Sequence, residues 1–377
     1  MLIGTMFRNM VTRCAHDTIA DMQSLLSNID ALLITNPTNI RYLTGFVGAA
    51  PEEREAYILL TPNQTFLFTN ALYLEQAKKT NATVVEISRE NSFAKKLAEI
   101  LTGPGPVKRL GFEENDLTVA EYKKLKTELK GVTLVATQGR VEELRILKRE
   151  DEIKNIRRAA KLTDQCFDVI LSKIKPGVTE GEIAWEIEAF IRARGAQLAF
   201  SPIVAFGINS SQPHYQPAES YKLKADSLVL IDFGIKVNGY CSDMTRMVFV
   251  GKPKDEWKRA YETVLEAQQA ALNYFHLEGV KAHLPGGKAD LIARDVIEKA
   301  GFPAYPHSLG HGVGLDIHEA PRLTINKDVI LKPGMVVTVE PAIYKEGSYG
   351  VRIEDLVLLK KDGIEVFTNT PKKMVIL

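Results

Sequence analysis

The sequence predicts an α+β protein of two domains, and three observations support this. The chain has 377 residues, more than a typical single hydrophobic core requires. Its first part mixes short apolar runs with polar helical stretches, which favours a small mixed α/β domain. After residue 200 come two long β-branched segments, each with a turn signal at its middle. Such hairpins predict antiparallel sheet with helices, and they exclude a βαβ nucleotide fold.

The N-terminal elements follow from local pattern. The runs DALLIT (30–35) and EAYILLTP (55–62) predict buried strands, and SFAKKLAEIL (92–101) predicts an amphipathic helix. The run GPGP (103–106) predicts a loop before another short strand, RLGFEE (109–114).

A long charged segment, residues 142–174, joins the two parts. Helical spacing relates its apolar positions Ile153, Ile156, Ala160, Cys166, Val169 and Ile170. A boundary just before this helix gives an N-terminal domain of residues 1–140 and a second domain of residues 141–377. Pro176 and Gly177 end the helix. Thr179 is then expected to cap a second helix, which Gly195 terminates.

The second domain contains two predicted hairpins. Asn238-Gly239 divides SLVLIDFGIKVNGYCSDMTRMVFV, and Asn-Gly between such runs is the strongest short hairpin signal. The segment GMVVTVEPAIYKEGSYGVRIEDLVLL repeats the arrangement, with its turn near Gly347. Helices are predicted between the hairpins, at about 255–278 and 288–300.

Four carboxylates lie in these otherwise apolar hairpins. Asp232 and Glu340 interrupt the first strands, and Asp243 and Glu354 lie in the partner strands. A two-residue turn at 238–239 places Asp232 opposite Thr245, with Asp243 roughly 7–8 Å away along the diagonal on the same face. A buried carboxylate needs a counter-charge. Salt bridges to Arg246 or Arg352 are the simpler alternative, but alternation should point Arg246 to the opposite face.

Metal ions would satisfy all four carboxylates together. The stretch HSLGHGVGLDIHEAP (307–321) holds three of the seven histidines and lies between the hairpins. Two divalent ions would neutralise the four negative charges. The ligands would be mainly oxygen atoms with one imidazole, and such a set is typical of Mn²⁺ and not of the thiolate-type zinc sites. Two ions roughly 3.5–4 Å apart can hold a bridging hydroxide and polarise a carbonyl. The predicted reaction class is metal-assisted hydrolysis.

These residues resemble a known family. The ordered set Asp232, Asp243, His311, Glu340 and Glu354, with the strings IDFG, GYCSDMTR, LGHGVGLDIHE, TVEPAIY and GVRIEDLV, resembles the dinuclear centre of the pita-bread metallopeptidases. The likeness is closer to the Xaa-Pro peptidases, aminopeptidase P and prolidase. ALLITNPTNIRYLTGFVG resembles their creatinase-like N-terminal domain. The resemblance covers the chain from about residue 20 and implies a pita-bread catalytic domain.

The resemblance also implies roles for single residues. The five residues of the ordered set would bind the metals, with Asp243 and Glu354 bridging both, and Glu340 would also transfer the proton. His214 would position substrate, and His318 would stabilise the carbonyl oxygen. His307 would line the proline pocket, and Arg352 would lie beside the metals and contribute to substrate binding. Ser308, after His307, and Met247, in TRM, depart from the usual family pattern but remove no ligand.

The expected activity is hydrolysis of the Xaa-Pro bond in dipeptides or at the N-terminus of small peptides. The expected cofactor is a pair of divalent ions, with Mn²⁺ favoured over Co²⁺, Zn²⁺ or Fe²⁺. A methionine aminopeptidase-like exopeptidase and a metal-free pita-bread binding module are the alternatives. The residues do not separate prolidase from aminopeptidase P. The resemblance further implies a homodimer.

Composition indicates which partners and which cellular location to expect. The net charge is +1, with 45% apolar and 25% charged residues, which gives no reason to expect a nucleic-acid partner. No apolar run approaches the roughly 18 residues of a membrane helix. MLIGTMFRNMVTR has a short apolar patch before its arginines, the reverse of a secretory signal. Three scattered cysteines favour a reducing compartment, so we expect a cytoplasmic protein.

Overall fold

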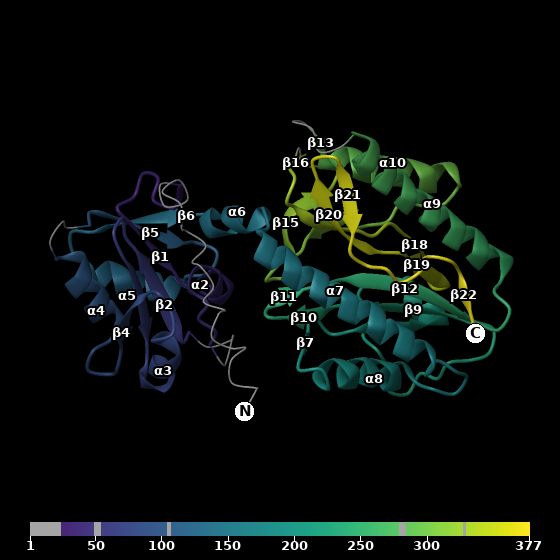
Figure 1. The fold of residues 1–377 in the computed structure, drawn as a ribbon, viewed down its shortest axis with the longest axis horizontal. Helices are drawn as coiled ribbons and strands as arrows, with labels where there is room; N and C mark the ends of the chain where they lie inside the picture. Colours follow the sequence, from purple (N-terminus) through teal and green to yellow (C-terminus); the bar gives the residue numbers. More distant parts are fainter. Residues whose placement is uncertain (1–23, 49–53, 104–106, 279–283, 327–328) are drawn as a thin grey trace, which may run out of the picture. The chain divides into compact units, whose positions relative to one another are not determined.

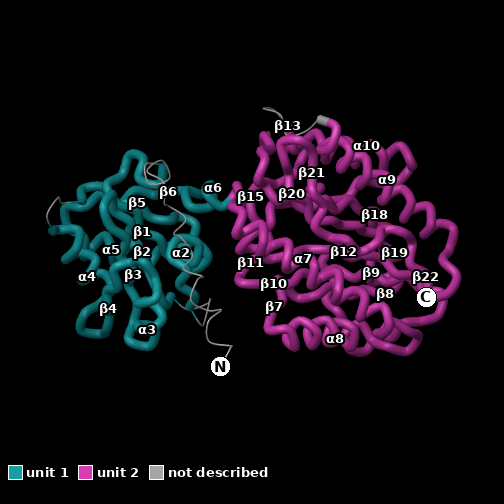
Figure 2. The backbone as a smooth tube through the Cα atoms, viewed as in Figure 1, with its two compact units in different colours: residues 1–145 teal, residues 146–377 magenta. Residues whose placement is uncertain are grey.

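The structure is a computed structural model that describes residues 24–48, 54–103, 107–278, 284–326 and 329–377 (Figure 1). The chain divides into two compact units, Met1–Arg145 and Ile146–Leu377 (Figure 2). The stretch MLIGTMFRNMVTR (1–13) and residues 104–106 of the expected loop lie outside the described residues.

Unit 1 is built on a six-stranded mixed sheet of order β4-β3-β2-β1-β5-β6. β1 is antiparallel to β2 and parallel to β5. The strands are β1 (Ala31–Ile34), β2 (Ala56–Leu60), β3 (Thr65–Thr69), β4 (Thr83–Glu86), β5 (Arg109–Glu113) and β6 (Thr133–Thr137). The helices are α2 (Pro37–Thr44), η1 (Ala71–Tyr73), α3 (Leu74–Ala77), α4 (Phe93–Leu101), α5 (Val119–Glu128) and α6 (Arg140–Ile146). The three expected strands and the helix at 92–101 are confirmed.

Helix α4 starts where the sequence placed it, because the Ser92 side chain accepts a hydrogen bond from Lys95 N. Its apolar face, with Leu97 and Leu101, packs in one core with Leu33 of β1 and Leu110 of β5. Burial of this stripe is what stabilises so short a helix.

The helices of unit 2 are α7 (Glu150–Leu171), α8 (Glu180–Arg192), η2 (Gly207–Ser211), α9 (Asp255–Glu278) and α10 (Gly286–Lys299). Thr179 caps α8 as expected, in a reciprocal capping box with Glu182. The charged segment 142–174 is broken between α6 and α7, because Arg149 adopts an extended backbone with φ −75° and ψ 165°. Val169, one of the helically spaced apolar positions, is 41% exposed.

Two sheets dominate unit 2, β22-β12-β9-β8 and β15-β14-β17-β20-β21. The strands are β7 (Gln197–Leu198), β8 (Ile203–Phe206), β9 (Ser227–Phe233), β10 (Ile235–Val237), β11 (Tyr240–Cys241), β12 (Met244–Val250), β13 (Leu284–Pro285), β14 (Gly310–Gly312), β15 (Glu319–Leu323), β16 (Ile330–Leu331), β17 (Val336–Val339), β18 (Ala342–Lys345), β19 (Tyr349–Arg352), β20 (Asp355–Lys360), β21 (Gly363–Val366) and β22 (Val375–Ile376). The pairing is largely antiparallel, as expected.

Both hairpins have the register that counting from their turns predicts. Asn238 and Gly239 have φ of 50° and 87°, as a two-residue turn of this kind requires. Val237 pairs with Tyr240, and Asp232 pairs with Thr245. The strand bends at Gly234, where a Cβ would lie 2.0 Å from Ser242 O. Continuous pairing around Gly347 (φ 65°) likewise confirms the second hairpin.

Helices cover both faces of the sheet that holds β9. Val229, Ile231 and Phe233 pack with residues of α7 and α8. Leu228 and Leu230 pack in a second core with residues of α9 and α10, which run along the opposite side of unit 2 (Figure 1). Side chains alternate along a strand, so Asp232 belongs to the face of Leu228 and Leu230. That core also contains Val337 and Val339 of the second hairpin, so the carboxylate faces the interior.

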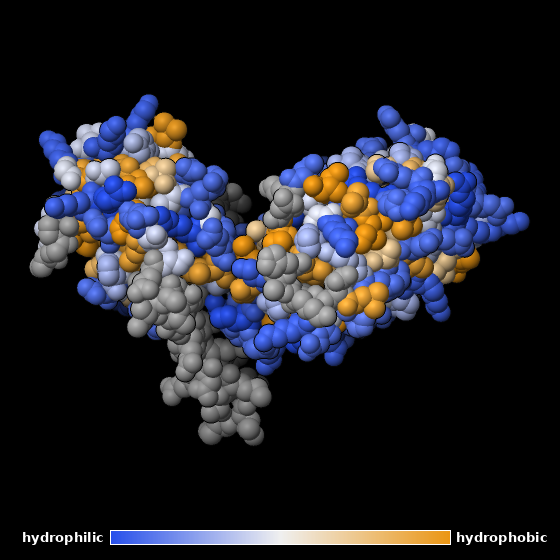
Figure 3. All heavy atoms as spheres, turned by 90° about the horizontal axis from the view of Figure 1, so that it is seen from above, coloured by the Kyte–Doolittle hydropathy of each residue, from blue (hydrophilic) through white to orange (hydrophobic). Residues whose placement is uncertain are grey.

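Hydrophobic side chains lie among hydrophilic ones on the surface of each unit in the face that Figure 3 displays. Exposed large apolar residues include Leu72, Val119, Trp185 and Leu277. Single exposed residues of this kind are normal on protein surfaces. Within the described part of the chain, no helix is both long and apolar enough to cross a membrane.

Candidate metal centre

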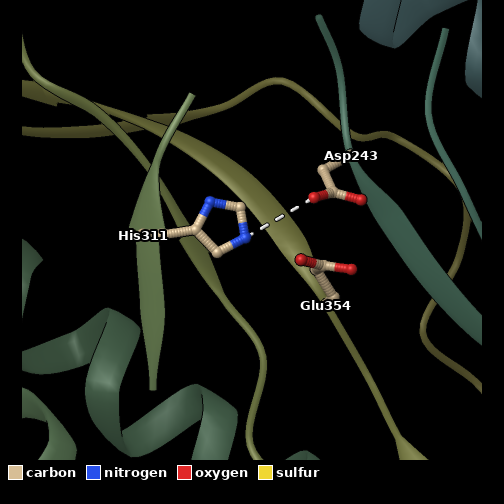
Figure 4. A group of neighbouring side chains, drawn as sticks. All are labelled: Asp243, His311 and Glu354. Carbon is tan, nitrogen blue, oxygen red and sulfur yellow. Dashed lines mark ion pairs between the residues drawn. The ribbon is translucent and has the colours of Figure 1, made fainter. Parts of the chain in front are cut away.

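Five polar residues, in strands or directly beside them, converge inside unit 2. Asp232 is the penultimate residue of β9, and Asp243 lies between β11 and β12. His311 is the central residue of β14, Glu340 follows β17, and Glu354 lies between β19 and β20. In Figure 4 the side chains of Asp243, His311 and Glu354 point toward one another.

The distances in this group suit a metal ion. One ligand atom from each of Asp243, His311 and Glu354 lies within 4.8 Å of the others, and all three residues are buried. His311 Nε2 is 3.7 Å from Asp243 Oδ2 and 3.4 Å from Glu340 Oε1. Both separations exceed the roughly 2.7–3.2 Å of a typical N–H···O hydrogen bond, and they leave room for a cation between the ligands.

The tautomer of His311 follows from its surroundings. Nδ1 lies 3.1 Å from the carbonyl oxygen of Gly312, which can only accept a hydrogen bond, so Nδ1 carries the proton. Nε2 then directs a lone pair at the carboxylates. Burial, followed by the nearby His318, lowers the pKa of His311 to about 3. The imidazole is therefore neutral at physiological pH, the form that binds metals.

The carboxylates are destabilised as anions in the absence of a cation. Burial and the charges of Asp232 and Glu340 raise the pKa of Asp243 well above its ordinary value. The pKa of Glu354 is raised in the same way, by burial and by Asp243. Burial also raises the pKa of Glu340 to about 8. A divalent ion would remove this penalty, because it supplies the missing positive charge.

Two buried oxygens show that these residues fit metal ions. Asp232 Oδ1 and Asp243 Oδ1 are inaccessible to solvent and have no hydrogen-bond partner among the described residues. A buried carboxylate oxygen without a partner is costly. Carboxylate oxygens together with one neutral imidazole are a ligand set that suits first-row divalent ions.

The salt-bridge alternative holds for only one of the four carboxylates. Arg352 Nη2 lies 2.5 Å from Asp232 Oδ2. Arg246 instead bonds to Asp355 at 2.7 Å, so it does point away from the cluster, as expected. Among the ion pairs of the described residues, Asp243 has only His311 as its partner, and a neutral imidazole supplies no counter-charge.

A hydrogen-bonded chain connects the carboxylates to His307. Arg352 Nη1 donates to Tyr344 Oη at 2.6 Å, and His307 Nε2 lies 3.2 Å from the same oxygen. Arg352 Nε donates to Thr245 Oγ1, which donates to Glu354 Oε2 at 2.8 Å. The guanidinium of Arg352 is thus bonded to protein groups. Sequence reasoning missed Tyr344 and Thr245, although both lie within the quoted strings.

The other three histidines predicted for the site, His214, His307 and His318, lie near this group. The His318 ring lies 4.4 Å from the His311 ring, edge to face, and is exposed. Burial lowers the pKa of His307 to about 4, and its ring stacks on Tyr305. His214 is exposed, and its charge affects the pKa values of Asp232, His307 and His318, so it lies close to them.

Metal removal should make the stability of the protein depend on pH. The folded-state pKa of Glu340, about 8, exceeds the unfolded value of about 4.3, so the folded metal-free protein binds more protons between these values. Below about pH 6.5 the lowered pKa values of His307 and His311 oppose this effect, so we expect the melting temperature of the metal-free protein to fall as the pH rises from about 6.5 to about 8. Added Mn²⁺ should raise it most at the high end, because metal competes with protons.

Scanning fluorimetry at several pH values, with chelator or with Mn²⁺, measures this directly. A metal-induced increase in melting temperature that is the same at pH 5.5 and pH 8 would contradict the expected coupling. Glu340→Gln should reduce the change of the melting temperature with pH in the metal-free protein. This result would assign part of that change to the Glu340 carboxylate.

Two family descriptions match the sequence. Residues 154–361 match "Metallopeptidase family M24", and residues 22–147 match "Creatinase/Prolidase N-terminal domain". An uncharacterized peptidase of Bacillus subtilis, YqhT, is 39% identical over 351 residues, which are 93% of this chain and 96% of the relative.

Solved structures give the same result. A structure described as an Xaa-Pro dipeptidase from Bacillus anthracis is similar with a TM-score of 0.89 and 39% identity, over 96% of this chain and 100% of that one. An X-Pro aminopeptidase from Thermotoga maritima is similar with a TM-score of 0.85 and 33% identity, over 94% of this chain and 99% of the other. The expected resemblance and two-domain fold are thus confirmed.

Proposed function

Because the chain belongs to metallopeptidase family M24, we propose that it hydrolyses the peptide bond that precedes proline in dipeptides or small peptides. The observation that carries this proposal is the buried group of Asp243, His311 and Glu354, with Asp232 and Glu340 beside it. The similarity to an Xaa-Pro dipeptidase and to an X-Pro aminopeptidase supports the choice of substrate.

The five residues Asp232, Asp243, His311, Glu340 and Glu354 would hold two divalent ions. Once bound, such a pair lowers the pKa of a shared water and polarises the carbonyl of the substrate. A bond to proline nitrogen is a tertiary amide without an N–H group. An enzyme that binds the carbonyl end of this bond therefore avoids the need for that missing donor.

The protein's own groups would supply the proton chemistry. Glu340 lies beside His311 and accepts a hydrogen bond from Thr338 Oγ1 at 3.2 Å, which orients its carboxylate. It would accept a proton from the attacking water and deliver it to the leaving nitrogen. His318, exposed beside His311, would donate to the developing oxyanion.

Other groups would bind the substrate. His214 and His307 would contact the peptide, with the His307 ring stacked against Tyr305 as part of the pocket wall. Arg352 acts indirectly in this proposal, because its donors bond to Asp232, Tyr344 and Thr245. It would hold Tyr344 and Asp232 in place.

Substrate profiling tests the proposal. With Mn²⁺ present, we expect cleavage of Ala-Pro or of Ala-Pro-Ala after the first residue, and little cleavage of the matched peptides Ala-Ala and Ala-Ala-Ala. Activity on the dipeptide alone assigns a dipeptidase, and activity on the tripeptide assigns an aminopeptidase. Absence of cleavage of both proline peptides by fully metal-loaded protein would refute the proposal.

The same assay separates the alternatives. A methionine aminopeptidase-like enzyme would prefer Met-Ala-Ala to Ala-Pro-Ala, and a binding module would contain no stoichiometric metal. The N-terminal match over residues 22–147 favours the Xaa-Pro assignment over the first of these. Manganese as the physiological ion, a homodimer and a cytoplasmic location stay predictions.

A further inference from the structure

A buried carboxylate outside the metal cluster accepts four hydrogen bonds from one segment. Glu180 is the first residue of α8 and is fully buried. Its Oε1 accepts from Phe206 N at 2.7 Å and from Asn209 Nδ2 at 2.9 Å. Its Oε2 accepts from Tyr215 Oη at 2.8 Å and from Ala218 N at 3.1 Å. All four donors lie in residues 206–218, the segment that carries His214.

The other side of this segment is bonded to β19. Gly350 N donates to Ser210 Oγ at 2.7 Å, and Arg352 Nη1 donates to Pro213 O at 3.4 Å. A Cβ on Gly350 would lie 2.0 Å from Ser210 O, so this close approach requires glycine. Residues 206–218 are therefore held between α8 and the strand that contains Arg352.

The position of His214 depends on its backbone. Its imidazole makes no hydrogen bond to the described part of the protein, yet the preceding residue, Pro213, accepts a hydrogen bond from Arg352, which also bonds to Asp232 of the cluster. The ring thus lies near the cluster without a direct tether. The bonds that fix residues 206–218 are what place it there.

Helix capping does not explain Glu180. Thr179 and Glu182 already form a complete capping box at the start of α8. Glu180 takes no part in that box, because the four hydrogen bonds to its carboxylate all come from residues 206–218. Its contacts therefore fix that segment and not the start of the helix.

We propose that Glu180 is a positioning residue that holds residues 206–218 so that His214 faces the metal cluster and contacts substrate. This inference rests on the proposed function, because it requires His214 to act on a bound peptide. Glu180 itself touches no reacting group.

A double-mutant cycle tests the coupling. Glu180→Ala should lower kcat/KM for Ala-Pro or Ala-Pro-Ala, whichever the wild type cleaves, by about 10- to 100-fold, because small displacements of a substrate-contacting group cost that much. In a His214→Ala background the same change should cost less than about threefold, since its effect passes through the missing imidazole. Metal content should stay at the wild-type value. Glu186→Ala, on the surface of the same helix, is the matched control and should match the wild type.

Hydrogen exchange gives a readout independent of activity. In Glu180→Ala, amide exchange should accelerate in peptides from residues 206–218 and remain unchanged in those from β9 and β12. If Glu180→Ala does not fold, Tyr215→Phe removes one of the four donors and should give a weaker form of both effects. Glu180→Gln keeps one acceptor oxygen and should restore part of the activity.

The outcomes separate the two proposals. Additive losses in the cycle, or unchanged exchange in residues 206–218, would overturn the role of Glu180 while Xaa-Pro cleavage by the wild type stands. Wild-type protein that cleaves no proline peptide would overturn the proposed function, and the positioning role with it.

Discussion

Asp243→Asn should lower kcat/KM for a Xaa-Pro peptide by more than about 1,000-fold. A carboxylate oxygen of Asp243 lies within 4.8 Å of ligand atoms of both His311 and Glu354, and Asp243 Oδ1 has no hydrogen-bond partner among the described residues. A metal-polarised carbonyl is worth several kcal/mol of barrier lowering, and about 4 kcal/mol corresponds to a thousandfold. Steady-state kinetics and metal analysis of the purified variant measure the loss of activity and of bound metal together.

Stability distinguishes metal loss from misfolding in this variant. Removing a buried negative charge relieves repulsion from Asp232 and Glu340. At pH 8 the metal-free variant should therefore melt no lower than the metal-free wild type. Asp168→Asn, an exposed position on α7, controls for the change in net charge and should retain full activity. An Asp243→Asn enzyme with wild-type kcat would contradict the assignment of Asp243 as a ligand.

Glu340→Gln should lower kcat by about 10²- to 10⁴-fold, the usual contribution of a general acid–base group. The amide has nearly the shape of the carboxylate but cannot accept and return a proton. The variant keeps Asp243, His311 and Glu354, so it should still bind at least one metal ion. Its KM should change little, because in this account Glu340 contacts the reacting water and not the peptide.

The control for Glu340→Gln is Glu346→Gln, an exposed position in the turn of the same hairpin. This variant should behave as the wild type does. A Glu340→Gln enzyme that contains no metal would assign Glu340 to metal binding alone. A kcat within a factor of about three of the wild-type value would remove Glu340 from the proton transfer.

The hairpins were predictable because two rules operate together. An Asn-Gly turn fixes the pairing, and strand alternation fixes the faces. Counting from Asn238 therefore gave the pairing of Asp232 with Thr245, which the structure has. The same rules directed Arg246 away from the cluster, where it bonds to Asp355. The convergence of the second hairpin and of His311 on the same point was expected from the family resemblance.

Tertiary contacts account for what was missed. Tyr344 becomes part of the site through Arg352, and Thr245 through Arg352 and Glu354, by bonds that cross between strands distant in sequence. Glu180 looks like an ordinary acidic residue in the first turn of a helix, and its burial depends on residues 206–218 folding over it. The extended backbone at Arg149 interrupts a segment whose periodicity indicated one helix.

Crystals grown or soaked with Mn²⁺, measured at the manganese absorption edge, test the central claim most directly. The account predicts two anomalous peaks roughly 3.5–4 Å apart, both within bonding distance of Asp243 and Glu354, with His311 Nε2 bound to one of them. Anomalous density elsewhere, or a cluster of paired carboxylates with no ion between them in metal-saturated and active protein, would contradict it.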